Sequence, residues 1–187
     1  MKTGFLPIAA LVLTMTSGSA FAQDGSTLTA EELAAKFMAQ QATRGLVIAP
    51  SGDAAATDAT DPNALPADTT FVALDPSAQV NFQIKFAFDS AALAEDEAAK
   101  LDTLCEVINA STIPQFKIIG HTDASGTDTY NQNLSLLRAE EVKRHLVEDC
   151  GIPEAKLLAE GVGEAFPLDP NDPRADVNRR VEFQVGS

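Results

Sequence analysis

The sequence predicts an α+β domain with the element order βαβαββ. Apolar side chains alternate with polar ones over 80–88 and 181–185, which is the period of a strand with one buried face. Apolar residues recur every three or four positions over 94–109 and 131–149, as they do on the buried side of a helix. This order favours a mixed sheet with both helices packed on one face. Two further apolar runs supply the remaining strands, at 115–120 and 157–163.

Length and charge limit the function classes. The chain has 187 residues and a formal net charge of −14 at pH 7. That length suits one domain with additional segments. Such acidity disfavours nucleic acid as a partner and also loose adhesion to an anionic membrane surface. Its simplest explanation is solubility.

Residues 1–22 have the organisation of a secretory signal peptide. Lys2 is the positive start, Phe5 to Met15 is mostly apolar, and Ala20-Phe21-Ala22 is an A-x-A cleavage site. The apolar run is too short to cross a bilayer core of ~30 Å. We therefore expect an exported mature chain without a transmembrane segment.

Residues 23–48 are predicted to contain a short helix. Thr29 and Glu32 have the spacing of a capping box, and Leu33 with Phe37 forms a small apolar patch. Two interpretations stay open at this point. The helix either packs on or floats beside its own domain, or it docks an envelope protein.

Residues 49–78 are predicted to be a linker. The part over 49–70 consists mainly of Ala, Asp, Thr and Pro. Such a composition buries too little apolar area to offset the entropy of ordering, so this part should be a flexible tether. The folded domain is then expected over 79–187.

The elements of this domain follow from local signals. The first strand and helix occupy 80–88 and 94–109, and Gly120 ends the second strand. Gly126 permits a turn with positive φ, and Asn131 is a good N-cap for the second helix. Gly151 is placed to stop that helix. Asp123 then lies at the mouth of the turn, and Arg138 lies about two turns into the helix.

Residues 120–142 also carry a family resemblance, in the pattern GHTDxxGxxxYNxxLSxxRAxxV. Phe86 to Leu93 (FAFDSAAL) and Asn178 to Glu182 (NRRVE) supply two further blocks in the right order. Together they resemble the OmpA-like (OmpA/MotB C-terminal) domain over roughly 79–187. The resemblance implies the same βαβαββ fold and non-covalent binding of peptidoglycan in the periplasm of a Gram-negative cell envelope.

The resemblance also implies a ligand site. In the family, the residues at the positions of Asp123 and Arg138 hold the ammonium and the carboxylate of diaminopimelate in the stem peptide. Asp123 alone is equally well explained as a turn-former. The NRR arginines lie near the family's binding site, and one of Arg179 and Arg180 is expected to support it. The complete predicted ligand set is Asp123, Arg138, Thr122, Gly126, Asn131, Leu134 and Arg180.

No catalytic site, cofactor or metal is predicted. His121 and Asp123 are two apart and resemble a catalytic pair, but no well-placed nucleophile or second base completes it. The histidines and cysteines show no C-x-x-C or H-x-x-x-H spacing. An exported hydrolase acting on the cell wall is therefore the least favoured function.

Cys105 and Cys150 are predicted to form a disulfide. An exported chain meets an oxidising compartment, and the two helices should lie side by side with the same polarity. Two separately buried thiols are the alternative.

The preferred function is a non-enzymatic peptidoglycan-binding protein that links the wall to the outer envelope or to a partner. The alternative is an exported structural protein whose N-terminal helix carries the activity, with wall binding only localising it.

Overall fold

The computed structural model describes residues 24–44, 71–87 and 90–186, and the side chain of Arg44 is left aside. The predicted signal peptide and the predicted tether over 49–70 lie outside these ranges. The helices are α1 (Ala30–Arg44), α2 (Glu95–Ala98), α3 (Asp102–Ala110) and α4 (Asp128–Glu148). The strands are β1 (Val80–Phe82), β2 (Phe116–His121), β3 (Leu157–Gly161) and β4 (Arg180–Val185).

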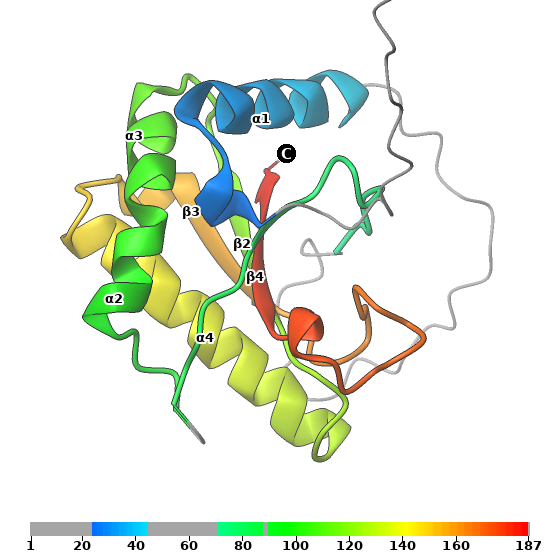
Figure 1. Cartoon of the computed structure of the whole chain (residues 1–187). Coiled ribbons are helices and arrows are strands. Elements are labelled where there is room, and N and C mark those ends of the chain that lie inside the picture. The colour runs from blue at the N-terminus through cyan, green and yellow to red at the C-terminus, as the bar shows by residue number, and fades with distance from the viewer. Residues whose placement is uncertain (1–23, 45–70, 88–89, 187) are drawn as a thin grey trace, which may run out of the picture.

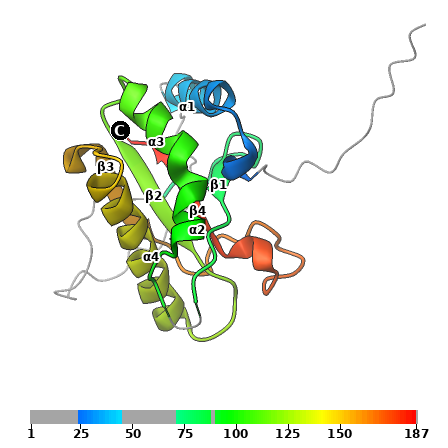
Figure 2. The same cartoon turned by 60° about the vertical axis from the view of Figure 1, so that its left-hand side comes forward.

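The strands form one mixed sheet in the order β1-β4-β2-β3. β4 is antiparallel to both β1 and β2, whereas β2 and β3 are parallel. Figures 1 and 2 show α2, α3 and α4 on one face of this sheet and α1 across one end. The predicted α+β class and the helices on one face are therefore confirmed. Among the described residues, no helix combines the length and the apolar character needed to cross a membrane.

The main core lies between the helices and the sheet. Alternate residues of β2 and β4 face it, because side chains alternate along a strand. Phe116, Ile118 and Phe183 have no exposed surface, and Val142 and Leu146 of α4 are equally buried. The apolar residues that recur with a strand period and those that recur with a helical period therefore pack together in one core.

The opposite face of the sheet is also buried, contrary to the expected single buried face. All residues of β4 are buried, including Glu182 and Gln184. The segment 71–79 contacts this face, where Gln184 Nε2 donates to the Val72 carbonyl at 3.0 Å. His121 Nε2 lies 3.1 Å from Glu182 Oε2. Gln184 Nε2 also donates to Glu182 Oε1 at 2.8 Å, so both carboxylate oxygens of Glu182 have a polar neighbour, which offsets part of the cost of burying this group.

The first strand is shorter than predicted. β1 ends at Phe82, whereas the alternation in the sequence extends to Phe88, which lies outside the described residues. The Ile84 N–H turns back to the Phe82 carbonyl, and the Lys85 N–H bonds to the Glu97 carboxylate at 2.8 Å. These bonds replace the strand ladder, so the chain leaves the sheet.

The predicted helix over 94–109 is divided. A turn of 3-10 helix at Ala99–Leu101 separates α2 from α3. Leu101, Leu104 and Ile108 are nevertheless fully buried. The apolar residues predicted to face the core are therefore buried as expected. Only the backbone differs, because a 3-10 turn with its i to i+3 hydrogen bonds interrupts the α-helix.

The N-terminal helix α1 packs on its own domain. The predicted capping box is confirmed, since Thr29 N–H donates to Glu32 and Glu32 N–H donates to Thr29 Oγ1. Leu33 and Phe37 are buried in the main core, and the Phe37 ring meets Phe116 edge to face at 5.1 Å. The apolar pair that suggested a docking surface is therefore occupied within the chain.

The disulfide between Cys105 and Cys150 is present. It joins α3 to the residue that follows the α4 C-cap, with the two Cα atoms 5.7 Å apart. Asn109 Nδ2 also donates to the Cys150 carbonyl at 2.9 Å. The end of α4 is thus joined to α3 covalently and by a hydrogen bond.

Candidate functional site

Two glycines bring α4 against the sheet. A Cβ atom at Gly120 would lie 2.0 Å from the Ser135 carbonyl oxygen, and one at Gly161 would lie 2.4 Å from the Leu136 nitrogen. No side chain fits at either position. This close approach places the N-terminal half of α4 beside the end of β2, so that Arg138 lies near the loop that carries Asp123.

Hydrogen bonds hold the loop after β2. The Thr122 N–H donates to the Gly163 carbonyl and the Ala124 N–H donates to the Pro173 carbonyl, both at 2.9 Å. The Ser125 N–H donates to Asp123 Oδ1 at 2.9 Å. Gly126 has φ +112°, which confirms the predicted positive value. The loop is therefore fixed by backbone bonds on both sides of Asp123.

Helix α4 begins earlier than predicted. Its N-cap is Thr127, whose Oγ1 accepts from the Tyr130 N–H at 3.3 Å, and Asn131 lies inside the first turn. Threonine and asparagine are both good caps, so local chemistry did not distinguish them. The Asn131 amide instead donates to the Asp123 carbonyl oxygen at 3.3 Å and to Glu164. Asn131 therefore braces the loop.

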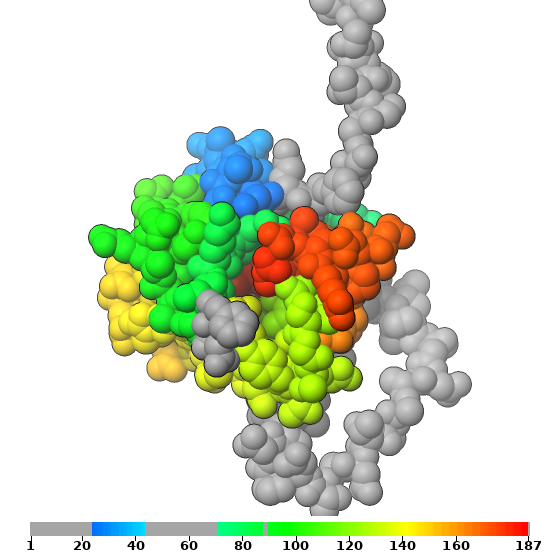
Figure 3. Space-filling model, turned by 60° about the horizontal axis from the view of Figure 1, so that its bottom comes forward, coloured from blue at the N-terminus to red at the C-terminus, as the bar shows by residue number. Residues whose placement is uncertain are grey.

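A cleft of about 340 Å³ opens at this end of α4. Figure 3 shows the three stretches of chain that meet there, in green, yellow-green and orange-red. Its lining combines charged, polar and apolar groups. The lining residues are Phe86, Ala87, Thr122, Asp123, Ser125, Tyr130, Asn131, Leu134, Arg138 and Arg179.

Asp123 is the anion of the cleft. Its Oδ2 lies 2.6 Å from Arg179 Nη1, and its Oδ1 accepts from Ser125. Burial alone would raise the pKa of the Asp123 carboxyl, but the hydrogen bonds from Arg179 and Ser125 outweigh it and lower the pKa below its ordinary value. Asp123 is therefore charged at neutral pH.

Arg138 is a buried cation on the facing wall. Only 9% of it is exposed, its Nε donates to the Ser90 carbonyl at 3.3 Å, and its guanidinium lies 4.8 Å from the Phe86 ring centroid. Burial lowers the pKa of Arg138, and the nearby charge of Arg179 acts in the same direction. The ordinary pKa of a guanidinium is so far above neutral that Arg138 stays cationic at pH 7. The cleft therefore presents one anion among two cations.

Most predicted site residues meet in this cleft. Asp123, Arg138, Thr122, Asn131 and Leu134 all line it. Gly126 lies beside the cleft rather than in its lining, since a Cβ there would contact Tyr130.

Arg180 lies elsewhere, contrary to its predicted place in the site. It is buried on the opposite face of the sheet, where its Nε donates to Asn81 Oδ1 at 3.1 Å. Arg179 takes the place in the cleft, because consecutive strand residues point to opposite faces. The sequence contained a signal for this outcome. Val181 and Phe183 face the helices, and Arg179 lies two residues before Val181, so its side chain points to the same face of the sheet.

The pair of His121 and Asp123 does not form a catalytic dyad. His121 is 2% exposed and belongs to the polar layer with Glu182, outside the lining of the cleft. Burial lowers the pKa of His121, so the ring is neutral at pH 7. Its contact with Glu182 on the neighbouring strand β4 gives His121 a structural role.

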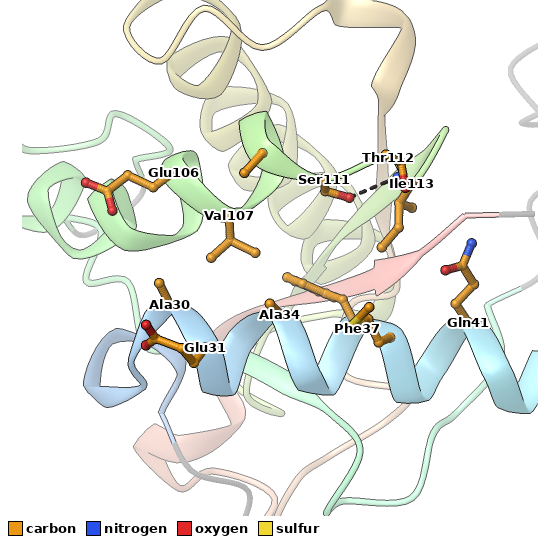
Figure 4. Close-up of a pocket in the computed structure, with 12 residues that line it drawn as sticks. Ala30, Glu31, Ala34, Phe37, Gln41, Glu106, Val107, Ser111, Thr112 and Ile113 are labelled. Atoms are coloured by element: carbon orange, nitrogen blue, oxygen red, sulfur yellow. Dashed lines mark hydrogen bonds between the residues drawn. The ribbon is translucent and has the colours of Figure 1, made fainter.

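A second hollow, of about 510 Å³, lies between α1 and α3. Figure 4 shows Ala34, Phe37 and Val107 on its walls and the Glu31 and Glu106 carboxylates nearby. Its lining includes no cation. The cleft at Asp123 is therefore the better candidate for a charged ligand, although it is smaller.

Comparison with known proteins identifies the family. The family model for the OmpA family matches residues 85–180, which span all the lining residues of the cleft.

The chain belongs to the OmpA family.

Curated relatives match a little more than half of the chain. Outer membrane porin F of Pseudomonas fluorescens is 36% identical over 109 residues, which is 57% of this chain and 33% of that protein. Outer membrane protein A of Bordetella avium is 35% identical over 103 residues, which is 54% of this chain and 52% of that protein. The chain thus spans a third to a half of these curated relatives.

A solved structure agrees with the OmpA-like fold. The OmpA-like domain of FopA1 from Francisella tularensis subsp. tularensis SCHU S4 has a TM-score of 0.50 and 27% sequence identity. The match covers 56% of this chain and 69% of that chain. Helix α1 precedes the matched family region and is an addition to it.

Proposed function

We propose that this protein is a non-catalytic, peptidoglycan-binding member of the OmpA family in the cell envelope, exported to the periplasm. The observation that carries the proposal is the cleft in which Asp123 lies between Arg138 and Arg179. All three lie within the matched family region, and the family signature implies wall binding at these positions.

The proposed ligand is the diaminopimelate of the stem peptide. One carbon of this residue carries both an ammonium and a carboxylate. Asp123 accepts from the ammonium, and the guanidinium of Arg138 holds the carboxylate by charge-assisted bonds. The free N–H groups at the start of α4 favour the same carboxylate. Arg179 keeps Asp123 ionised and adds a second cation.

Rigid placement supports a binding role for this cleft. Asp123 is fixed by Ser125 and Arg179, and Arg138 is held against Phe86 and Ser90. A site that is preorganised in this way loses little entropy when a ligand binds. What the protein joins to the wall is a separate question, because Leu33 and Phe37 of α1 pack inside the domain.

Sedimentation with purified peptidoglycan tests the proposal. Asp123→Ala and Arg138→Ala should each weaken binding at least tenfold, since a charge-assisted bond contributes about 1.5–3 kcal/mol and ~1.4 kcal/mol is one decade. Arg138→Lys should restore binding only in part, because an ammonium lacks the planar fork. Arg144→Ala is the matched control, since Arg144 is exposed on the same helix and is not in the lining of the cleft.

Wall chemistry supplies the second control. Peptidoglycan with lysine in place of diaminopimelate lacks the second carboxylate and should bind at least tenfold more weakly. Circular dichroism checks that each variant is folded. Equal binding of the wild type to both walls, with unchanged binding by the folded Asp123 and Arg138 variants, would contradict the proposed site.

A further inference from the structure

The far end of α4 carries a second cluster of reactive side chains. The first half of α4 contributes Tyr130, Leu134 and Arg138 to the cleft, and the helix then continues away from it, as Figure 2 shows for the backbone. With 21 residues, α4 is about 30 Å long. At this far end, Cys105 of α3 meets Cys150 and His145. Their three ligand atoms lie within 4.8 Å of one another. Among the described residues, these three side chains lie close enough to hold a metal ion, although their spacing in the sequence did not predict a metal site.

A carboxylate orients the imidazole. His145 Nδ1 lies 2.8 Å from Asp149 Oδ2, and a carboxylate can only accept, so Nδ1 carries the hydrogen. In the neutral ring, Nε2 then holds the lone pair, and it lies 3.9 Å from Cys150 Sγ. A carboxylate bonded to the remote nitrogen is the usual support of a histidine that binds a metal.

One donor distance is already close to that around a small tetrahedral cation. Zinc lies about 2.3 Å from thiolate sulfur and about 2.0–2.1 Å from imidazole nitrogen, so its ligands stand roughly 3.5–3.8 Å apart. The Nε2 to Sγ distance already approaches this value. The Cα atoms of Cys105 and Cys150 lie 5.7 Å apart, so side-chain rotation alone can separate the sulfurs once they are not bonded.

We propose that reduction of the Cys105–Cys150 disulfide creates a binding site for a thiophilic cation such as Zn²⁺. A dithiol reductant transfers two electrons and two protons to the disulfide and itself becomes a disulfide. The cation then displaces the two thiol protons and binds both thiolates and His145 Nε2, which leaves the fourth position to water. Cysteine and histidine ligands of this kind select zinc or copper(I).

The exchange preserves the connection between the two helices. In the oxidised chain, the disulfide joins α3 to the end of α4. In the reduced chain, the metal joins the same residues, supported by the bond from Asn109 to the Cys150 carbonyl. Reduction in the presence of zinc should therefore leave the fold intact, whereas reduction without zinc should lower its melting temperature.

Equilibrium dialysis against Zn²⁺ tests this site. The chain is reduced with a phosphine, which is then removed under nitrogen, and bound zinc is measured by atomic emission. The reduced wild type should bind one Zn²⁺ per chain, and the oxidised chain should bind none at the same concentration. Co²⁺ in place of Zn²⁺ should give the thiolate charge-transfer absorption. Cys105→Ser should weaken binding more than a hundredfold.

Substitutions of His145 and of Asp149, the carboxylate that orients it, test the role of each residue in zinc binding. His145→Asn and Asp149→Asn should each weaken Zn²⁺ binding about 10–100-fold. Glu148→Gln is the matched control, because Glu148 is an exposed neighbour that pairs with Arg144. Melting curves of the reduced chain with and without Zn²⁺ report folding independently.

The inference is wrong if the reduced wild type binds no more zinc than a Cys105→Ser/Cys150→Ser double variant. It is also wrong if His145→Asn leaves the zinc affinity unchanged, because two thiolates alone would then hold the metal. A reduced chain that unfolds and does not regain its circular dichroism spectrum with Zn²⁺ would equally contradict it.

Discussion

The Asp123 carboxylate shows how neighbours determine the state of a single side chain. Ser125 and Arg179 donate to its two oxygens, and these bonds outweigh the cost of burial. The pKa of Asp123 is therefore below that of an unfolded aspartate, which is about 3.9. A group whose pKa falls on folding contributes stability above the unfolded value and loses it as the pH falls through the folded value.

Asp123→Asn should consequently change the acid dependence of stability. Above about pH 5 the variant should be less stable than the wild type by about 1 kcal/mol or less, because Arg179 is 42% exposed and its ion pair is partly screened. The difference should shrink below about pH 4 as the wild-type carboxylate is protonated. Urea unfolding between pH 3 and pH 7 measures it, and a difference that is independent of pH would contradict this account.

Gly120→Ala should be among the most damaging small substitutions. Its Cβ would lie 2.0 Å from the Ser135 carbonyl oxygen, so α4 would have to move away from the sheet. We expect a loss of more than about 3 kcal/mol in the free energy of unfolding, together with weaker wall binding.

Gly151→Ala separates crowding from backbone strain. Gly151 has φ +69° and open space around it, so alanine there should cost only about 1–2 kcal/mol. Urea denaturation compares the two variants. Equal losses would show that the close approach of α4 is not what Gly120 provides.

At the scale of elements, α1 behaves as part of the domain. Gln40 Nε2 donates to the Ala78 carbonyl, and Gln40 Oε1 accepts from the Val185 N–H, both at 2.9 Å. Phe37 is 1% exposed, whereas the adjacent Met38 is 68% exposed. One side of this helix is therefore core and the other side is surface.

Phe37→Ala and Met38→Ala form a matched pair on α1. Removing the Phe37 ring should cost about 3–5 kcal/mol, because it leaves a cavity in the core. Met38→Ala should change stability by about 0.5 kcal/mol or less. Thermal unfolding of both variants checks this difference. A small loss for Phe37→Ala would favour a helix that only floats beside the domain.

At the scale of the whole molecule, the folded unit is larger than the predicted 79–187. Leu28, Leu33 and Phe37 belong to the same hydrophobic core as Phe116 and Phe183. The family region over 85–180 thus shares its core with residues that precede it. The cleft and the disulfide stand at opposite ends of α4, so one helix connects the two chemical sites.

A chain of residues 79–187 should fold less stably than one of 24–187. Leu28, Leu33 and Phe37 would be lost from the core, and each buried apolar side chain contributes about 1.5–3 kcal/mol. We expect the free energy of unfolding to fall by more than about 3 kcal/mol. Urea denaturation of both chains measures it, and equal midpoints and slopes would show that α1 adds nothing to the core.

The sequence by itself determined the class of fold and most of the candidate site. The periods of the apolar residues predicted the order of strands and helices, because an element with one buried side has apolar residues at regular intervals. The spacing of Asp123, Gly126 and Arg138 placed a charged pair around a turn, and the family signature supported it. Gly126 and the capping box of α1 were predictable because they depend on local backbone chemistry.

Tertiary structure decided what depends on residues distant in sequence. The strand after Phe82 ended because Glu97 took the Lys85 N–H. The buried polar face of the sheet needed the segment 71–79 to pack on it. Arg179 entered the cleft instead of Arg180, and His145 met the cysteines, only once strands and helices had been placed. Contacts of this kind leave no periodic pattern in the chain, because they join residues through space rather than along the sequence.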